Sequence, residues 1–386
     1  MVTAALLGSG LFARNSYLPA LPVPGLTAST LWSRSEASVL ALAQAASERG
    51  LLNPTTLSGD EGLDAILNDA AIDALILVLP IGVQPAIIRR AWQKGKHVIS
   101  EKPVGRNVEQ ARELVEEYER EWEDKLVWRV AENFAHEPFL HRAAALLNPD
   151  NVGPVLYWQM HYETLLPEGV SYHATTWRTV PDYQGGFLLD GGVHWAALAR
   201  TVLPFRCKPH TIIANKSLHR AYMLPHDTLI GTVQSDPASA IPPLGGRKQV
   251  AGTLKEEDMP VASGMSAPNG TFILSWAIPD TDRTTRPPNE LYVVCERATL
   301  RVISKGREWS VVLEPAEGER LEEGGPMSGV SVELVDFAEA VDARKEGRAE
   351  KENYGAPRDA LWDVAFIQAA LDSNGNKVVI DDVLKA

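Results

Sequence analysis

The sequence predicts an α/β protein in which a doubly wound parallel sheet comes first and an α+β domain with a large, open, mostly antiparallel sheet follows. Three observations support this fold class. The 386 residues exceed what one core usually organises, so two domains are expected. Short apolar segments alternate with helical patterns up to about residue 130, as in βαβ units. The stretch that follows holds many strand-like segments with few helices, which favours antiparallel pairing. We place the domains at residues 1–134 and 135–386.

The strands expected in the first domain are short apolar segments that end in glycine, proline or polar residues. Between them apolar residues recur at helical spacing, and the last helix is rich in paired charges, as a solvent-facing helix should be. The expected strands cover residues 3–7, 26–32, 74–79, a stretch that begins at His97, and 126–130; the expected helices cover 36–48, 63–68, 85–94 and 108–121.

The second domain should be dominated by strands and closed by two amphipathic helices. A stretch from Ser235 to Pro268 is rich in Pro, Gly and Ser and has no period, so we expect a long loop that could act as a lid. The expected strands cover 155–163, 211–215, 228–233, 271–276, 290–294, 299–303 and 310–314, and the helices cover 332–343 and 356–372.

Composition excludes several classes of function. The formal net charge is -13 and no Lys/Arg cluster stands out, which disfavours binding to nucleic acid or to an anionic membrane. Cys207 and Cys295 lie far apart in the sequence, so we expect neither a disulfide framework nor a metal site. The longest apolar run, Ala74–Leu79, is too short to span a bilayer, and no basic leader precedes the first strand. We therefore expect a cytoplasmic protein.

A glycine motif follows the first expected strand directly. The sequence Gly8-Ser9-Gly10-Leu11-Phe12-Ala13 has the G-x-G-x-x-A form of the dinucleotide fingerprint, between a strand and a helix. The first glycine permits a tight turn, the second lets a pyrophosphate approach the backbone, and the small third residue lets helix and strand pack closely. The alternative is an ordinary glycine turn. The context favours a Rossmann-type cofactor site.

The second expected strand ends in Ser33-Arg34-Ser35. About 20 residues after the glycines, an acidic residue would bind the ribose hydroxyls of NAD, whereas an arginine accommodates the 2′-phosphate of NADP. This chain has no acid there. We therefore predict NADP (NADPH) as cofactor, with Arg34 on the phosphate and Ser33 or Ser35 adding hydroxyls. The alternative is that Arg34 is a solvated loop residue.

A lysine closes the strand that begins at His97, within Glu101-Lys102-Pro103. The carboxyl ends of parallel strands border the crevice where ligands bind. Pro103 fixes the chain and biases Lys102 away from the α region, so we expect the ammonium to project from a stiff backbone. The alternative is a solvated surface charge.

The segment from Gly185 to Trp195 is the second chemically suggestive stretch. If a helix opens near Asp190, Asp190 and His194 are one turn apart and share a face. A carboxylate beside an imidazole can orient it and raise its pKa, which suits acid/base work near neutral pH. The alternative is a capping aspartate with an ordinary buried histidine.

These motifs occur in the same order and spacing as in the glucose-fructose oxidoreductase and inositol dehydrogenase family (Gfo/Idh/MocA), which the chain resembles over nearly its whole length. The segments around Trp177 and Gly186–His194 look most like a fungal NADP-dependent subgroup. The resemblance implies that Lys102 relays the proton, that His194 is the acid/base at the substrate oxygen, and that Asp190 positions both. It also implies homo-oligomers formed through the open sheet. Further residues expected at the cofactor are Leu79, Pro80, Gln84, Glu101, Lys102, Asn133, Trp177 and Arg178.

The chain departs from the family pattern at two places. Members that oxidise sugars commonly carry another Asp about one turn after the histidine, where this chain has the apolar run Trp195–Leu198. Many members also have Asn and His near the positions of Ile81 and Gln84. We therefore expect a small carbonyl compound, secondary alcohol or imine rather than a polyol, in a pocket that Trp195 would make still more apolar. The competing function is a dinucleotide-binding sensor or transcriptional regulator without turnover.

Overall fold

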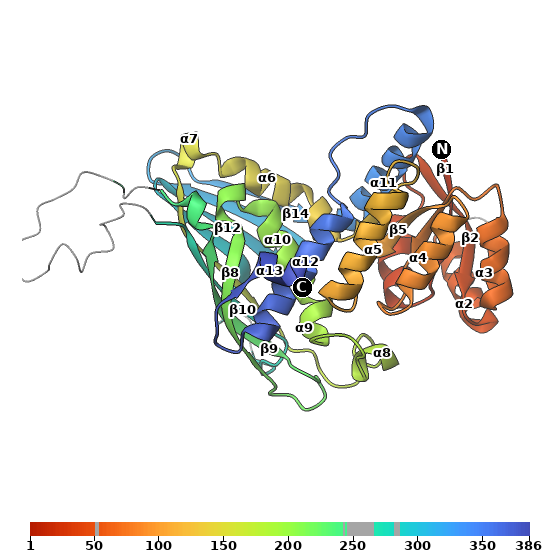
Figure 1. Ribbon diagram of the computed structural model, residues 1–386, viewed down its shortest axis with the longest axis horizontal. Helices are drawn as coiled ribbons and strands as arrows, with labels where there is room; N and C mark the ends of the chain where they lie inside the picture. Colours follow the sequence, from red (N-terminus) through yellow and green to blue (C-terminus); the bar gives the residue numbers. More distant parts are fainter. Residues whose placement is uncertain (51–53, 242–243, 245–265, 282–285) are drawn as a thin grey trace, which may run out of the picture.

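The computed structural model describes residues 1–50, 54–241, 244, 266–281 and 286–386. Two sheets with their helices form the molecule, and the N-terminal and C-terminal parts lie beside each other with α5 and α12 between the sheets (Figure 1). Within the described residues, no helix is long and apolar enough to cross a membrane.

The first sheet is fully parallel, as predicted. Its strand order is β3-β2-β1-β4-β5-β6, which reverses between β1 and β4 and so creates a ligand crevice at the carboxyl ends. The edge strand β3 was not predicted, because its four residues are half-exposed and form no apolar run. The strands are β1 (Val2–Leu7), β2 (Leu26–Ser33), β3 (Thr55–Ser58), β4 (Ala74–Leu77), β5 (His97–Glu101) and β6 (Trp128–Ala131).

Both faces of this sheet are covered, because alternate residues of each strand point in opposite directions. In β1, Leu6 packs into one hydrophobic cluster and Leu7 into the other. One face carries the short π-helix η1 (Ala13–Tyr17), α1 (Leu18–Ala20), α2 (Glu36–Ser47) and α11 (Gly329–Glu346). The other carries α3 (Gly59–Asn68), α4 (Gln84–Gln93) and α5 (Val108–Glu121). A late helix, α11, therefore lies against the early sheet.

The second sheet has nine strands in the order β14-β13-β12-β11-β7-β10-β9-β8-β15. All neighbours are antiparallel except β7 and β10, which confirms a mostly antiparallel sheet. The short strands β14 and β15 were not predicted, since β14 contains two glycines and β15 only two residues. The strands are β7 (Val155–Glu163), β8 (Pro209–Ser217), β9 (Thr228–Ser235), β10 (Asn269–Ser275), β11 (Asn289–Cys295), β12 (Ala298–Lys305), β13 (Glu308–Pro315), β14 (Leu321–Pro326) and β15 (Val378–Val379).

Helices pack on one face of this sheet, where α12 contacts α10 and β8 and α6 contacts β13. The predicted closing helices are present as α11 and α12. The segment expected as a lid, 235–268, lies mostly outside the described residues. The remaining elements are the 3₁₀ turns η2 (Asn133–His136), η3 (Phe205–Cys207) and η4 (Pro237–Ser239), with α6 (Pro138–Leu146), α7 (Pro149–Val152), α8 (Thr176–Thr179), α9 (Phe187–Asp190), α10 (Gly192–Val202), α12 (Pro357–Ser373) and α13 (Ile380–Lys385).

The other face of the second sheet leaves large apolar side chains accessible. Tyr157, Ile213 and Ile230 are 45%, 44% and 52% exposed. Strand register places all three on the same side, through β7, β10, β9 and β8. Such a patch is typical of a surface that contacts another protein.

Candidate active site

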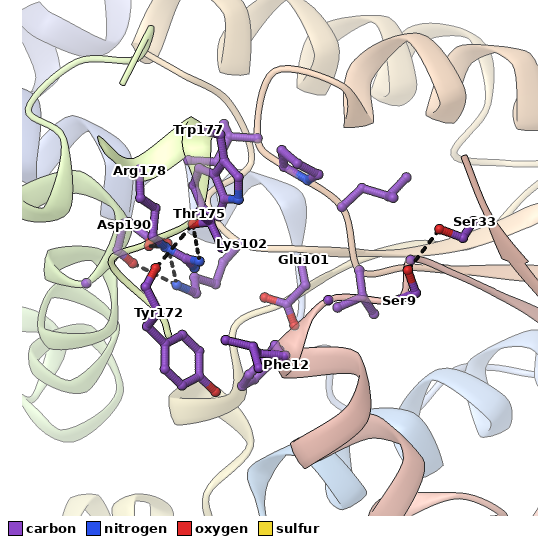
Figure 2. A pocket seen from close by; sticks show the side chains of 18 of the residues that line it. Ser9, Phe12, Ser33, Glu101, Lys102, Tyr172, Thr175, Trp177, Arg178 and Asp190 are labelled. Carbon is purple, nitrogen blue, oxygen red and sulfur yellow. Dashed lines mark hydrogen bonds and ion pairs between the residues drawn. The ribbon is translucent and has the colours of Figure 1, made fainter. Parts of the chain in front are cut away.

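A cleft of about 700 Å³ opens at the carboxyl ends of the first sheet. One wall comes from the first domain and the other from the segments around α8, α9 and α10 (Figure 2). Among the predicted site residues, the cleft is lined by Gly8, Ser9, Gly10, Leu11, Phe12, Ser33, Arg34, Leu79, Pro80, Glu101, Lys102, Trp177, Arg178, Asp190 and His194. Residues that are far apart in the sequence, from Gly8 to His194, thus meet at one place.

The glycine turn has the shape that a dinucleotide needs. Gly8 has φ +124°, and a Cβ there would lie 2.1 Å from the Val78 carbonyl oxygen, so only glycine fits. A Cβ on Gly10 would meet no atom within 4 Å, although Gly10 lines the cleft, so its backbone is open to a ligand. Ala13 is buried beneath the turn and lies outside the cleft lining, where it fulfils the packing role of the motif's third position. These residues fit a pyrophosphate.

Serine and arginine side chains form the end of the cleft beside β2. The Ser9 and Ser33 hydroxyls lie 2.8 Å apart and join the glycine turn to the end of β2. Ser35 caps α2 by accepting from the Ser38 amide. Arg34 lines the cleft, is exposed, and has no hydrogen-bond or ion-pair partner among the described residues. A guanidinium is therefore free to bind an anion at this end.

Lys102 and Asp190 form the ionic centre of the cleft. The Lys102 Nζ donates to the Asp190 carbonyl oxygen at 2.7 Å and to its Oδ1 at 3.0 Å. Arg178 Nε donates to Asp190 Oδ2 at 2.9 Å, and its guanidinium lies 3.9 Å from the Trp177 ring centroid (Figure 2). Burial acts to raise the pKa of Asp190, but the Lys102 and Arg178 cations outweigh it and lower that pKa. The Lys102 side chain is only 13% exposed, so it is not a solvated surface charge.

His194 does not pair with Asp190, contrary to the sequence-based expectation. Asp190 ends α9, and Gly191 separates it from α10, which begins at Gly192. The partner of His194 Nδ1 is Glu132 Oε1, at 2.6 Å, directly after β6. Burial would raise the pKa of Glu132, but the attraction and hydrogen bond of His194 lower it. Asp190 therefore contacts Lys102, and Glu132 orients the histidine.

Packing against Phe134 also fixes the imidazole. The two rings are stacked with centroids 4.7 Å apart. Glu132 accepts from the Phe134 amide through the same Oε1 that binds His194. The strand end, the following 3₁₀ turn and α10 thus hold one imidazole between a carboxylate and an aromatic ring.

Three residues expected at the cofactor have other positions. Besides Ala13, the structure leaves Gln84 and Asn133 out of the cleft lining. Gln84 is buried and donates to the Glu101 carbonyl oxygen at 3.0 Å, so it supports the strand end from behind. Asn133 begins η2, and its backbone lies against Gly329 at the start of α11. A Cβ on Gly329 would be only 2.1 Å from the Asn133 carbonyl oxygen.

Trp195 is also not a pocket residue. It is 3% exposed and packs against Tyr162 and Phe134. The tryptophans that line the cleft are Trp32, Trp177 and Trp276, and the Trp276 ring would be 2.5 Å from a Cβ on Gly191. The apolar run Trp195–Leu198, where the chain departs from the family pattern, therefore belongs to the hydrophobic core. The apolar character of the pocket comes from other residues.

Sequence reasoning missed several lining residues of the second domain. They come from loops and short helices without a period, so no local signal marks them. Glu132, outside the lining, was also missed, although a carboxylate directly after a strand is a usable signal. The missed lining residues are mostly apolar or aromatic and comprise Leu166, Tyr172, Thr175, Phe187, Gly191 and Trp276. Within the described residues, no group of three His, Cys, Asp or Glu side chains could hold a metal ion.

Known proteins share these features. Residues 2–126 match a family described as "Oxidoreductase family, NAD-binding Rossmann fold". The chain is 35% identical to the dehydrogenase FPY6 of Fusarium mangiferae over 238 residues, or 61% of this chain and 68% of that protein. An oxidoreductase of Thermotoga maritima is 25% identical, with a TM-score of 0.76 over 99% of both chains. An oxidoreductase of Agrobacterium radiobacter, solved with NAD+, L-tartaric acid and magnesium, is 16% identical with a TM-score of 0.72 over 99% of both chains.

Proposed function

Because the chain belongs to the Gfo/Idh/MocA oxidoreductase family, we propose that it is an NADP-dependent oxidoreductase that interconverts a small carbonyl compound and its alcohol. An imine is a further candidate substrate. The observation that carries this proposal is that Lys102 and His194, from two different domains, line the same cleft as the glycine turn.

The cofactor would be held by the first domain. Gly8 and Gly10 bring the backbone close to the pyrophosphate, and the bound nicotinamide supplies or accepts the hydride. Arg34 and Ser33 take the 2′-phosphate of NADP. Because the Agrobacterium structure contains NAD+, the preference for NADP rests on this chain's own residues at the end of β2.

Two proton-carrying groups remain available to a substrate oxygen. An ammonium has three N–H donors, and Asp190 accepts two from Lys102, which leaves one for the substrate. Glu132 occupies Nδ1 of His194, so Nε2 is left to exchange a proton with the substrate. The two groups stabilise negative charge that develops on the oxygen. Arg178 acts indirectly, since it helps to hold Asp190 in place.

The substrate end of the cleft favours a compound with few hydroxyl groups. Leu166, Phe187 and Trp276 line it from the second domain, and the cation of Arg178 is already bonded to Asp190. Tyr172 and Thr175 also line the cleft and can bond a hydroxyl, but a polyol would leave its further hydroxyls without partners against the apolar side chains, which costs free energy. We therefore favour an apolar aldehyde or ketone over a sugar.

A substrate screen tests this function and separates it from a sensor. Aldehydes, ketones, imines and polyols are offered with NADPH and NADH in turn, or with the oxidised forms for alcohols, and cofactor absorbance is followed. Turnover of an apolar carbonyl with NADPH is expected. Tight NADPH binding without turnover of any compound would instead support the sensor.

We also propose that the open face of the second sheet joins two or more copies of the chain. Tyr157, Ile213 and Ile230 would be buried by that contact. Ile230→Glu should shift the sedimentation coefficient toward that of a monomer, whereas Leu40→Glu, at an exposed apolar residue on α2, should not. The free, buried thiols of Cys207 and Cys295 suit the reducing cytoplasm that we propose as the setting.

A further inference from the structure

We propose that Tyr17, Glu101 and Glu333 form a buried cluster that holds one shared proton, and that this proton leaves when the oxidised cofactor binds. The second half of the proposal rests on the proposed cofactor. The first half concerns only this chain's own residues and stands without it.

Three segments that are distant in sequence bring the cluster together. Tyr17 ends η1, Glu101 ends β5 and Glu333 lies on α11, the late helix that covers the first sheet. The Tyr17 hydroxyl oxygen is 2.7 Å from Glu101 Oε1 and 3.2 Å from Glu333 Oε1. All three side chains are buried, and Glu101 also lines the cleft.

A count of donors requires an additional proton. A phenol has one hydrogen, and the shorter contact assigns it to Glu101. If Glu333 were ionised, its carboxylate would face a hydroxyl oxygen without a donor, and its Oε2 has no partner either. A buried carboxylate without a donor is strongly disfavoured. Glu333 is therefore the acid that donates to the Tyr17 oxygen, while Tyr17 donates to Glu101.

The surrounding charges agree with one proton retained by the Glu101–Glu333 pair. Burial raises the pKa of Glu101 to about 8, although Lys102 and the Tyr17 hydrogen bond act to lower it. Burial also raises the pKa of Glu333, with repulsion from Glu101 and Glu132. Asp190 further disfavours ionisation of Glu101, and Glu137 that of Glu333. Lys102 is the only cation among these neighbours.

Release of the proton follows the chain of hydrogen bonds. The Tyr17 hydrogen passes to Glu101 Oε1, the Glu333 proton passes to the Tyr17 oxygen, and Glu101 loses its proton to water in the cleft. The net change is one carboxylic acid converted to a carboxylate and one proton in solution. An oxidised nicotinamide ring carries a positive charge and would favour the ionised cluster, whereas a reduced ring is neutral.

Infrared difference spectroscopy tests the shared proton on the full-length protein without cofactor. At neutral pH the wild type should show the carbonyl band of a protonated carboxyl group that Glu333→Gln lacks. Asp336→Asn is the matched control, because Asp336 lies on the same helix but bonds to His136. An unchanged band in Glu333→Gln would overturn the proposal.

Binding titrations test the link to the cofactor. The association constants of NADP+ and NADPH are measured from about pH 6 to 9, a range that brackets the raised pKa of Glu101. Both forms carry the same phosphates, so their difference isolates the ring charge. The NADP+ constant should rise relative to that of NADPH by up to about tenfold per pH unit. In Glu333→Gln this relative rise should fall below about twofold.

Each outcome has one meaning. Equal pH dependence of the two forms in the wild type would overturn the coupling even if the variant does not fold. A relative rise that Glu333→Gln retains would assign the rise to a group outside the cluster, and would also overturn the coupling. Failure of both forms to bind would overturn the proposed function and the coupling with it, while the infrared result would still decide the shared proton.

Discussion

The bond between His194 and Glu132 provides a sharp test of how the site prepares its imidazole. Glu132→Gln keeps the size of the side chain and removes its charge. The hydrogen bond is 2.6 Å long and the Glu132 side chain is 3% exposed, so solvent screens it little. A charge-assisted hydrogen bond contributes about 1.5–3 kcal/mol and a neutral one about 0.5–1.5 kcal/mol. The variant therefore loses about 1–2 kcal/mol of transition-state stabilisation.

This loss corresponds to a roughly 5- to 30-fold fall in kcat. The assay is NADPH consumption with the best carbonyl compound from the screen, together with the Kd of NADPH and the melting temperature. Only kcat should change, because Glu132 acts through His194. Asp336→Asn is the control, since it removes the carboxylate that bonds another histidine, His136. A kcat of Glu132→Gln within twofold of the wild type would refute the reasoning.

Two further substitutions and one pH dependence have defined outcomes. Arg34→Gln should raise the Kd of NADPH about 10- to 150-fold, because it removes one charged hydrogen bond of about 1.5–3 kcal/mol. The Kd of NADH should stay unchanged. Equal effects on both Kd values would contradict the assignment of Arg34 to the 2′-phosphate. Gly191→Ala should lower the free energy of unfolding by about 1–3 kcal/mol and raise KM for the carbonyl compound, because the new Cβ displaces the Trp276 ring. An unaltered melting curve and KM would contradict this contact. Burial raises the pKa of Glu101, and with it that of the proton it shares with Glu333, to about 8, so the stabilising contribution of this proton is complete below the unfolded-state pKa of about 4.3 and is lost as the pH rises through 8. The melting temperature should fall over that range, and less so in Glu333→Gln; parallel curves would count against the cluster.

The sequence predicted the first sheet well because its signals are local. Buried parallel strands are continuous apolar runs, and the glycine turn after β1 has steric demands that few residues meet, as the 2.1 Å approach to Val78 at Gly8 shows. Lys102 could be placed in the cleft because a parallel sheet sends every strand's carboxyl end to one edge.

Contacts between distant segments could not be predicted in the same way. The spacing of Asp190 and His194 suggested a pair, but Gly191 divides the helix, and each has a partner in the first domain: Lys102 for Asp190, which also binds Arg178, and Glu132 for His194. Glu333 reaches Tyr17 only because α11 returns to the first sheet. Such partners depend on how helices and strands pack against one another, and a local sequence pattern does not predict that packing.

Lys102→Ala tests the central claim most directly, namely that this ammonium exchanges the proton at the substrate oxygen. Asp190 keeps its bond to Arg178 in this variant, so the cleft retains one of its two ion pairs. We expect kcat for carbonyl reduction to fall about 10²- to 10⁴-fold, with the Kd of NADPH nearly unchanged. Unchanged kcat would show that the lysine has no chemical role, and an equal loss of NADPH affinity would show that it only binds the cofactor.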